Sequence, residues 1–305
     1  MTLVSTATSL PGQMLDEYLA TARAAVDRWL DQRLPTEQVA PATLHRAMRH
    51  SLFAGGKRLR PVLCLAAAEA CGGSLENALP AAAAVECIHT FSLIHDDLPC
   101  MDDDDFRRGV PTCHKVFGDA VAVLAGDALQ ALAFEMVAAM PGNAACPAAA
   151  MVHELAQASG SLHLIGGQVL DLEGEGRDLS APELQAIHER KTAALLATSV
   201  RLGAMSAAAG DQQLAALTRF GRTVGLAFQV IDDILDVTQS SETLGKSAGK
   251  DQAVGKATYP QVFGLERSRE IAHQLTDEAH AALEPFGGDG AMLRAIGDYL
   301  LVREY

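Results

Sequence analysis

The chain has 305 residues, of which 49% are hydrophobic and only 5% aromatic, and its formal net charge is −14. A chain of this length and apolar content can bury a sizeable core, whereas one this acidic is a poor partner for nucleic acid or an anionic membrane surface. Alanine and leucine dominate the apolar set, which favours close-packed helices over sheets. The six cysteines show no CxxC spacing, so we expect reduced thiols rather than a disulfide framework.

The N-terminal part is predicted to begin with a loose tail over residues 1–12 and to continue into a single domain over residues 13–305. Apolar residues recur with a helical period over residues 14–34, and a second helix is predicted over residues 44–53. The sequence shows no basic segment followed by an apolar core at its start and no run of 18 apolar residues. We therefore expect a cytoplasmic protein without a signal peptide and without membrane insertion.

A basic turn, Gly55-Gly56-Lys57-Arg58-Leu59-Arg60-Pro61, separates the second helix from the next one, which is predicted over residues 62–71. Lys57 and Arg60 lie near the N-terminus of that helix, where the helix dipole also favours an anion. The turn is either an ordinary basic loop or part of an anion-binding site.

Residues 96–105 carry six aspartates, directly after the apolar end of a predicted helix and directly before an arginine pair. Like charges this close repel one another, so the cluster needs either solvent or a divalent cation, and oxygen ligands without His or Cys suit Mg²⁺. Asp96 and Asp102 would lie about 240° apart on an ideal helix. They can converge only if the helix ends between them, and Pro99 is predicted to end it.

Further segments are predicted along the rest of the chain. They are an apolar helix over residues 119–140, a helix over 148–160, a segment over 162–172 with Gly167, Gln168 and Asp171, a helix that Ser180 caps and that carries Lys191 and Thr192, and a helix over 214–238 with Asp232, Asp233 and Asp236. Asp232 and Asp236 are four residues apart, so their carboxylates share one face of the helix. Residues 240–260 are polar and rich in glycine, and they form either a flexible basic flap or a solvated linker. No alternating strand pattern and no Pro/Ser-rich linker is present, so we predict one all-α domain.

Two acidic clusters on separate helices, flanked by lysine and arginine, indicate a site that holds a polyanion through several Mg²⁺ ions. Each cluster alone is also compatible with a solvated acidic face. The chain lacks the acidic ladder of an EF-hand, the G-x-x-x-x-G-K-[ST] motif of a P-loop and the G-x-S-x-G motif of a serine hydrolase.

Taken in order, these motifs resemble those of the trans-isoprenyl diphosphate synthases, in particular the bacterial farnesyl diphosphate synthases. The resemblance extends from about Leu44 to Pro260. It rests on the turn at residues 55–61, the first aspartate motif Asp96-Asp97-Leu98-Pro99-Cys100-Met101-Asp102, Arg107-Arg108-Gly109, Gly167-Gln168 with Asp171, Lys191-Thr192, the second motif within Phe228-Gln229-Val230-Ile231-Asp232-Asp233-Ile234-Leu235-Asp236, and Lys246 with Lys256.

The resemblance implies an all-helical bundle around a deep central cavity, a homodimer, isoprenyl diphosphates as substrates, and about three Mg²⁺ (or Mn²⁺) ions per site. The implied metal ligands are Asp96, Asp97, Asp102, Asp232 and Asp236. The implied contacts of the allylic diphosphate are Arg107, Lys191, Lys246 and Lys256, and those of isopentenyl diphosphate are Lys57, Arg60, His89 and Arg108. Thr192 and Gln229 would line the reacting centre.

The implied reaction condenses isopentenyl diphosphate with an allylic diphosphate. Phe91 and Ser92 precede Asp96 by roughly one turn of helix, where a bulky ring would close the floor of the cavity. An aromatic residue here, with a two-residue insertion between the motif's aspartates, implies farnesyl diphosphate (C15) as the main product, made from dimethylallyl or geranyl diphosphate. A C10 or C20 product, a non-catalytic partner subunit and a terpene cyclase are the alternatives.

Overall fold

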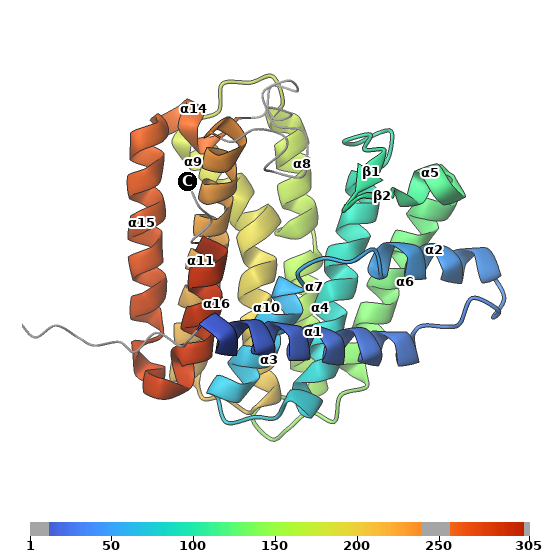
Figure 1. Cartoon of the computed structure of the whole chain (residues 1–305), viewed down its shortest axis with the longest axis horizontal. Helices are drawn as coiled ribbons and strands as arrows, with labels where there is room; N and C mark the ends of the chain where they lie inside the picture. Colours follow the sequence, from blue (N-terminus) through green and yellow to red (C-terminus); the bar gives the residue numbers. More distant parts are fainter. Residues whose placement is uncertain (1–11, 239–256, 302–305) are drawn as a thin grey trace, which may run out of the picture.

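The computed structural model describes residues 12–238 and 257–301, and these are almost entirely helical (Figure 1). The elements in chain order are α1 (Gly12–Arg33), α2 (Ala42–Leu52), α3 (Leu59–Ala70), α4 (Leu75–Asp96), β1 (Phe106–Arg107), β2 (Val110–Pro111), α5 (Cys113–Phe117), α6 (Asp119–Ala138), α7 (Ala148–Ser159), α8 (Leu164–Gly174), α9 (Ala181–His188), the π-helical turn η1 (Glu189–Ala193), α10 (Ala194–Ser206), α11 (Asp211–Thr238), α14 (Tyr259–Phe263), α15 (Leu265–Ala282), the 3₁₀ turn η2 (Glu284–Gly290) and α16 (Ala291–Leu301). The prediction of an all-α fold is confirmed.

The first two helices run across the long upright helices of the bundle (Figure 1). In α1, Leu19, Ala22, Val26 and Leu30 recur at intervals of three and four residues, and all four are buried. This apolar stripe fixes which face of the helix packs against the bundle. The predicted helix over residues 14–34 corresponds closely to α1.

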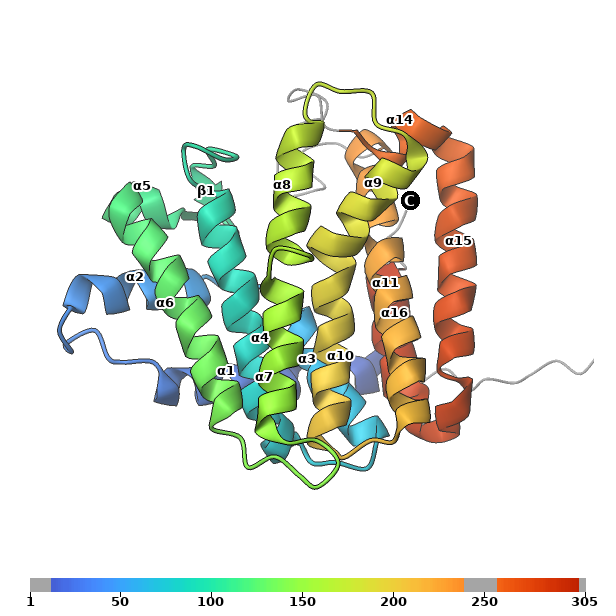
Figure 2. The same cartoon turned by 180° about the vertical axis from the view of Figure 1, so that it is seen from behind.

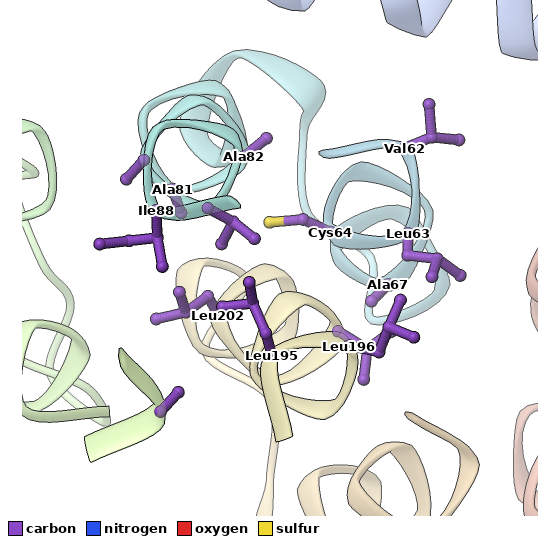
Figure 3. Close-up of a cluster of buried hydrophobic side chains, with 14 of the residues drawn as sticks. Val62, Leu63, Cys64, Ala67, Ala81, Ala82, Ile88, Leu195, Leu196 and Leu202 are labelled. Atoms are coloured by element: carbon purple, nitrogen blue, oxygen red, sulfur yellow. The ribbon is translucent and has the colours of Figure 1, made fainter. Parts of the chain in front are cut away.

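The centre of the bundle is formed by α3, α4 and α10, whose facing side chains are drawn in Figure 3. Buried residues of these three helices include Leu63, Cys64, Ala67, Ala82, Ile88, Leu195 and Leu202. Gly203 allows α10 to approach α3 closely, because a Cβ atom there would lie 1.9 Å from the carbonyl oxygen of Cys64. Small side chains thus bring helix backbones into direct contact at the centre of the core.

The six cysteines are all free, as the sequence predicted. Cys64, Cys87, Cys113 and Cys146 are buried, and Cys71 is half-buried. Burial raises the pKa of the Cys64 and Cys87 thiols above their ordinary value. A raised pKa keeps these thiols protonated and inert at neutral pH.

β1 and β2 form a short antiparallel hairpin that was not predicted. Arg107 pairs with Val110. The two connecting residues, Arg108 and Gly109, have φ angles of 54° and 80°, which a type I′ hairpin turn requires. Each strand has only two residues, so no alternation of apolar and polar residues could reveal it in the sequence.

One end of the bundle brings together the segments that carry the motifs. The C-terminal ends of α4, α8 and α11 lie at the top of Figure 1, and Figure 2 shows the same arrangement from behind. The β1–β2 hairpin follows α4 at this end, and α14 lies there too (Figures 1 and 2). Both aspartate motifs therefore meet at one end of the molecule.

Two helices, α4 and α6, are long and apolar enough to cross a membrane by length and composition alone. In α4, 67% of the apolar window is buried within the bundle, as expected of a core helix, whereas in α6 only 39% is buried. The outer face of α6 exposes Val123 and Leu124. These two apolar side chains lie on the outside of the bundle.

Candidate active site

The first aspartate motif begins where α4 ends. The helix stops at Asp96, and Asp97 forms its C-terminal cap, as Pro99 predicted. The loop then turns back, because the backbone N–H of Asp102 donates to the carbonyl oxygen of Asp96 at 2.9 Å and that of Asp104 donates to Asp97 at 3.2 Å. This fold-back places Asp102 beside the end of the helix, next to Asp96.

The Asp96 carboxyl is held in an environment that disfavours its charge. Burial raises its pKa to about 6, the nearby charges of Asp102 and Asp97 add to the rise, and the cations of Lys191 and Arg107 oppose it. Lys191, which belongs to η1, therefore lies close enough to Asp96 for their charges to interact. A carboxylate that repels its neighbours in this way gains from binding a cation.

Asp97 and Arg107 bind each other. The Arg107 Nε atom donates to both carboxylate oxygens of Asp97, at 2.8 and 2.9 Å. Asp97 is buried, with 3% of its surface exposed, and Arg107 also lies 3.6 Å from Asp104. The pair joins the β1–β2 hairpin to the end of α4. In this structure the two side chains are paired with each other, and their roles toward a metal ion and a diphosphate stay predictions.

Lys191 and Thr192 lie on η1, a π-helical turn between α9 and α10. The Lys191 Nζ atom is 2.6 Å from the Asp171 carboxylate of α8. Gly167 permits this approach, since a Cβ atom there would lie 2.4 Å from the backbone nitrogen of Lys191. The hydroxyl of Thr192 donates to the Gln229 side-chain oxygen of α11 at 3.2 Å. π-helical turns are rare and frequently occur at functional sites.

The second aspartate motif lies near the C-terminal end of α11. Asp232 is partly exposed, whereas Asp236 is buried, with 6% exposed. Burial lowers the pKa of His188 to about 4, while Asp171 and Asp232 oppose that shift and Lys191 adds to it. His188 therefore lies close to charged side chains of α8, η1 and α11.

Asp233 was not among the predicted site residues, yet it joins several elements of the site. Its carboxylate accepts a hydrogen bond from the Gln229 side-chain amide at 3.0 Å and another from the backbone N–H of Tyr259 at 2.9 Å. His188 lies 4.0 Å from the same carboxylate and stacks on Tyr259, with ring centroids 5.4 Å apart. Asp233 thus connects Thr192, through Gln229, to the start of α14. The signal available in the sequence was its position directly after Asp232.

A second cluster, of cationic residues, lies beside the first aspartate motif. Burial and the charges of Arg60, Arg108 and Arg107 lower the pKa of His89 well below its ordinary value. Gly56 lies against Arg108, because a Cβ atom there would be 2.5 Å from the guanidinium carbon. The structure therefore brings together Arg60, His89 and Arg108, which lie on separate segments of the sequence.

Lys57 is exposed, and its Nζ atom lies over the Tyr299 ring of α16 at 5.3 Å from the ring centroid. Lys246 and Lys256 fall outside the described residues, as does most of the predicted flap.

The Phe91 ring, predicted to close the cavity floor, is buried with 6% exposed and packs edge-to-face on His95, with centroids 5.5 Å apart. His95 in turn lies against α6, with its Nε2 atom 3.0 Å from the carbonyl oxygen of Val123. The Ser92 hydroxyl donates to the carbonyl oxygen of His89 within α4. Most of the Phe91 surface is therefore covered by protein.

The donor set fits Mg²⁺ without forming a complete metal centre. Among residues 12–238 and 257–301, no group of three His, Cys, Asp or Glu side chains is arranged to hold a metal ion. Mg²⁺ is commonly held by one or two carboxylates, with phosphate and water in the remaining positions. Asp96, Asp102 and Asp232 are the partly exposed predicted carboxylates, so they suit a cation that is shared with a bound diphosphate.

Two cavities are found among the described residues. A small one, of about 30 Å³, lies between α2, α4 and the hairpin, next to the first aspartate motif, with Asp97, Arg107 and Arg108 in its wall. The other, of about 700 Å³, lies between α7, α9, α10, α11 and α15 and is lined by none of the predicted site residues. The larger cavity therefore does not coincide with the predicted site residues.

Comparison with known proteins agrees with this arrangement. A family model described as polyprenyl synthetase matches residues 41–284. The chain is 51% identical to the large subunit 1 of a heterodimeric chloroplastic geranylgeranyl pyrophosphate synthase from Arabidopsis thaliana, over 94% of this chain and 79% of the relative. It is 50% identical to a chloroplastic geranylgeranyl pyrophosphate synthase from Capsicum annuum, over 94% and 78%.

Solved structures share the fold. An FPP/GFPP synthase from Zymomonas mobilis superposes with a TM-score of 0.83 at 37% identity, covering 95% of this chain and 98% of that one. A geranyltransferase from Helicobacter pylori, complexed with magnesium and isoprenyl diphosphate, superposes with a TM-score of 0.81 at 32% identity, covering 96% and 98%.

The expectation of a cytoplasmic protein is wrong by this comparison, because the plant relatives from Arabidopsis thaliana and Capsicum annuum are described as chloroplastic. The expectation had rested only on missing sequence features. The helical fold, the two aspartate motifs at one end of it and the match over residues 41–284 lead to one conclusion: the chain belongs to the polyprenyl synthetase family of trans-isoprenyl diphosphate synthases.

Proposed function

We propose that this prenyltransferase joins isopentenyl diphosphate to an allylic diphosphate and that its main product is geranylgeranyl diphosphate (C20). The observation that carries the reaction is that both aspartate motifs lie at one end of the bundle, where the charge of Lys191 acts on Asp96 and on His188 and the charge of Asp232 acts on His188. The observation that favours C20 is that relatives about half identical to this chain are described as geranylgeranyl pyrophosphate synthases. The C20 product replaces the farnesyl product that was expected from Phe91.

The two kinds of charged cluster suit two different diphosphates. In our proposal the allylic diphosphate lies between Asp96 and Asp102 on one side and Asp232 and Asp236 on the other, next to Lys191. Isopentenyl diphosphate lies at the cationic cluster of Lys57, Arg60, His89 and Arg108, which contains the residue types that bind a diphosphate directly. The neutral imidazole of His89 can still donate one hydrogen bond.

Bound Mg²⁺ would neutralise the allylic diphosphate so that it can leave. The metal is supported by the oxygen-only donor set and by the magnesium in the Helicobacter pylori structure. The number of about three ions stays a prediction.

The residues of the chain then act on the organic part of the substrates. Lys191 would contact the leaving diphosphate, and the Thr192 hydroxyl and Gln229 amide would place their dipoles beside the carbon that becomes cationic. The isopentenyl double bond attacks that carbon, and the released diphosphate accepts the proton that is lost. Apolar helix faces around the growing chain exclude water, which would otherwise quench the cation.

Phe91 is assigned a packing role in this proposal. Its ring is covered by His95 and by the rest of the core, so it offers little surface to stop a growing chain. Product analysis by mass tests this directly, with isopentenyl diphosphate, each allylic diphosphate and Mg²⁺. We expect C20 from the wild type and no lengthening in Phe91→Ala. A wild type that stops at C15, together with longer products from Phe91→Ala, would restore the farnesyl assignment.

The same assay separates the remaining alternatives. A non-catalytic partner subunit gives no condensation product, and a terpene cyclase gives a hydrocarbon without consuming isopentenyl diphosphate. Excess chelator should abolish turnover, because the diphosphate then has no cation to share with the aspartates.

We also propose that the protein assembles as a homodimer through the outer face of α6, where Val123 and Leu124 are exposed. The Arabidopsis relative described as the large subunit of a heterodimer indicates that a second kind of partner occurs among such proteins. In the proposed homodimer, the same face of a second copy of this chain packs against Val123 and Leu124.

A further inference from the structure

Arg58 holds the basic turn of residues 55–61 in place through three separate elements. Its residue surface is 3% exposed, and its backbone adopts a left-handed φ of 51° just before α3 begins. The guanidinium donates from Nε to Asp27 of α1 at 2.9 Å, from Nη1 to Glu86 of α4 at 2.8 Å, and from Nη2 to the carbonyl oxygen of Leu52 at the end of α2. All three nitrogen atoms are engaged by protein acceptors.

Glu86 is the buried carboxylate that pairs with Arg58. It is 1% exposed and precedes His89 by one turn of α4. Burial lowers the pKa of Arg60 to about 10, and the charge of Glu86 opposes that fall. Burial also lowers the pKa of Arg108, again with Glu86 as the main opposing charge. One buried carboxylate thus compensates the positive charge that three arginines bring together.

A buried ion pair of this kind rarely stabilises a fold more than apolar residues of the same size would. Its value here lies in geometry. The planar guanidinium of arginine fixes both the direction and the distance of its hydrogen bonds. The residues next to Arg58 in the chain are Lys57 and the Leu59-Arg60 start of α3. Arg60 has an Nε atom that is buried without a hydrogen-bond partner among the described residues, so it retains a free donor for an anion.

We propose that Arg58 and Glu86 are positioning residues for the isopentenyl diphosphate site. They do not touch the substrate themselves; they fix the backbone of the turn that carries Lys57 and of the start of α3 that carries Arg60 before the diphosphate arrives. This inference rests on the proposed function, because it takes the cationic cluster to be the isopentenyl site.

The test compares Arg58→Lys and Glu86→Gln with the wild type. KM is measured for each substrate at saturating concentration of the other, and binding of inorganic diphosphate is measured by calorimetry in chelator, which removes metal-mediated binding at the aspartate motifs. We expect the KM for isopentenyl diphosphate to rise about tenfold or more, with the allylic KM and kcat within about threefold of wild type, and diphosphate binding to weaken by the same factor.

Two further variants separate positioning from folding. Asp31→Asn removes a surface ion pair with Arg49 that also joins α1 to α2, and it should leave both KM values unchanged. The double variant Arg58→Met with Glu86→Met removes both buried charges at once, so it should fold yet keep the raised isopentenyl KM. The proposal is overturned if the double variant binds isopentenyl diphosphate normally, or if the single variants lower the melting temperature and change the two KM values equally.

Failure of the proposed function has a different signature. If the protein is not a prenyltransferase, the wild type gives no condensation product at all, and if only the C20 assignment fails, the wild type gives a product of another length. The calorimetric experiment still decides the present inference, because diphosphate binding to the cationic cluster either depends on Arg58 and Glu86 or does not.

Discussion

Asp96 is the residue at which stability and function conflict most directly. Its carboxyl has a raised pKa in the metal-free protein. A carboxyl whose folded pKa lies above its unfolded value of about 4 destabilises the fold increasingly as the pH rises from about 4 to about 6, and by a constant amount above that. At neutral pH without metal, the charge of Asp96 therefore acts against folding.

We expect Asp96→Asn to raise the melting temperature of the protein in excess chelator at pH 7. A carboxyl with a pKa of about 6 in the folded protein and about 4 in the unfolded chain corresponds to a gain on the order of 1–3 kcal/mol, and the gain should vanish below about pH 4, where both proteins are uncharged at this position. Turnover with Mg²⁺ should fall by about a hundredfold or more. Thermal unfolding at both pH values and steady-state kinetics measure the two effects.

Asp103→Asn is the matched control for Asp96→Asn. Asp103 is exposed and has a left-handed φ of 47° that asparagine also tolerates. The Asp103→Asn substitution should change neither the melting temperature nor the turnover of the protein appreciably. A lower melting temperature for Asp96→Asn in chelator would show that the Asp96 carboxylate is satisfied by the protein alone, and the argument for a shared cation would lose its basis.

At the scale of elements, the sequence predicts helix ends and helix faces, because these depend on neighbouring residues. It does not predict contacts between residues that are far apart in the chain. The end of α4 between Asp96 and Asp102 follows from Pro99, and the shared face of Asp232 and Asp236 follows from their spacing. The bond between Asp233 and the backbone of Tyr259 joins residues 26 positions apart. No local pattern indicates such a partner.

The same limit applies to the roles of Asp97 and Arg107. Each has the chemistry for metal or phosphate binding, and their sequence positions matched such roles. The hairpin that presents Arg107 to Asp97 depends on positive φ angles at Arg108 and Gly109, which the sequence suggests only weakly. Their pairing could therefore be found only in the folded structure.

The contact between α3 and α10 gives a prediction at this scale. Gly203→Ala would place a Cβ atom 1.9 Å from the carbonyl oxygen of Cys64, and neither backbone can move without disturbing the core. We expect the free energy of unfolding to fall by about 1–3 kcal/mol or more, measured by urea denaturation. Gly210→Ala is the control, because a Cβ atom there has no neighbour within 4 Å; it should change stability little. Equal effects of the two substitutions would contradict the close helix contact.

At the scale of the whole molecule, charge and apolar surface are distributed unevenly. The net charge is −14, yet Arg58, Arg60 and Arg108 gather around one buried carboxylate. The acidic surface favours solubility, while the local cationic cluster sets which anions bind. In our proposal, substrate recognition therefore depends on a small cationic region of an otherwise acidic chain.

The exposed face of α6 provides the prediction for assembly. Leu124 is 56% exposed and Val123 39%, on a helix of which only 39% of the apolar window is buried within the bundle. A charge placed there would be desolvated in an interface between two copies, so Leu124→Glu should convert a dimer to a monomer, measured by light scattering after size exclusion.

Met14→Glu is the matched control for Leu124→Glu, because Met14 is 48% exposed on α1; it should leave the wild-type mass unchanged. A wild type with the mass of a single chain, or one that requires detergent or lipid vesicles to stay in solution, would assign the α6 face to a different partner. The mass of the wild type therefore decides whether a second copy covers α6, and the two variants decide whether the covered face is the one that carries Leu124.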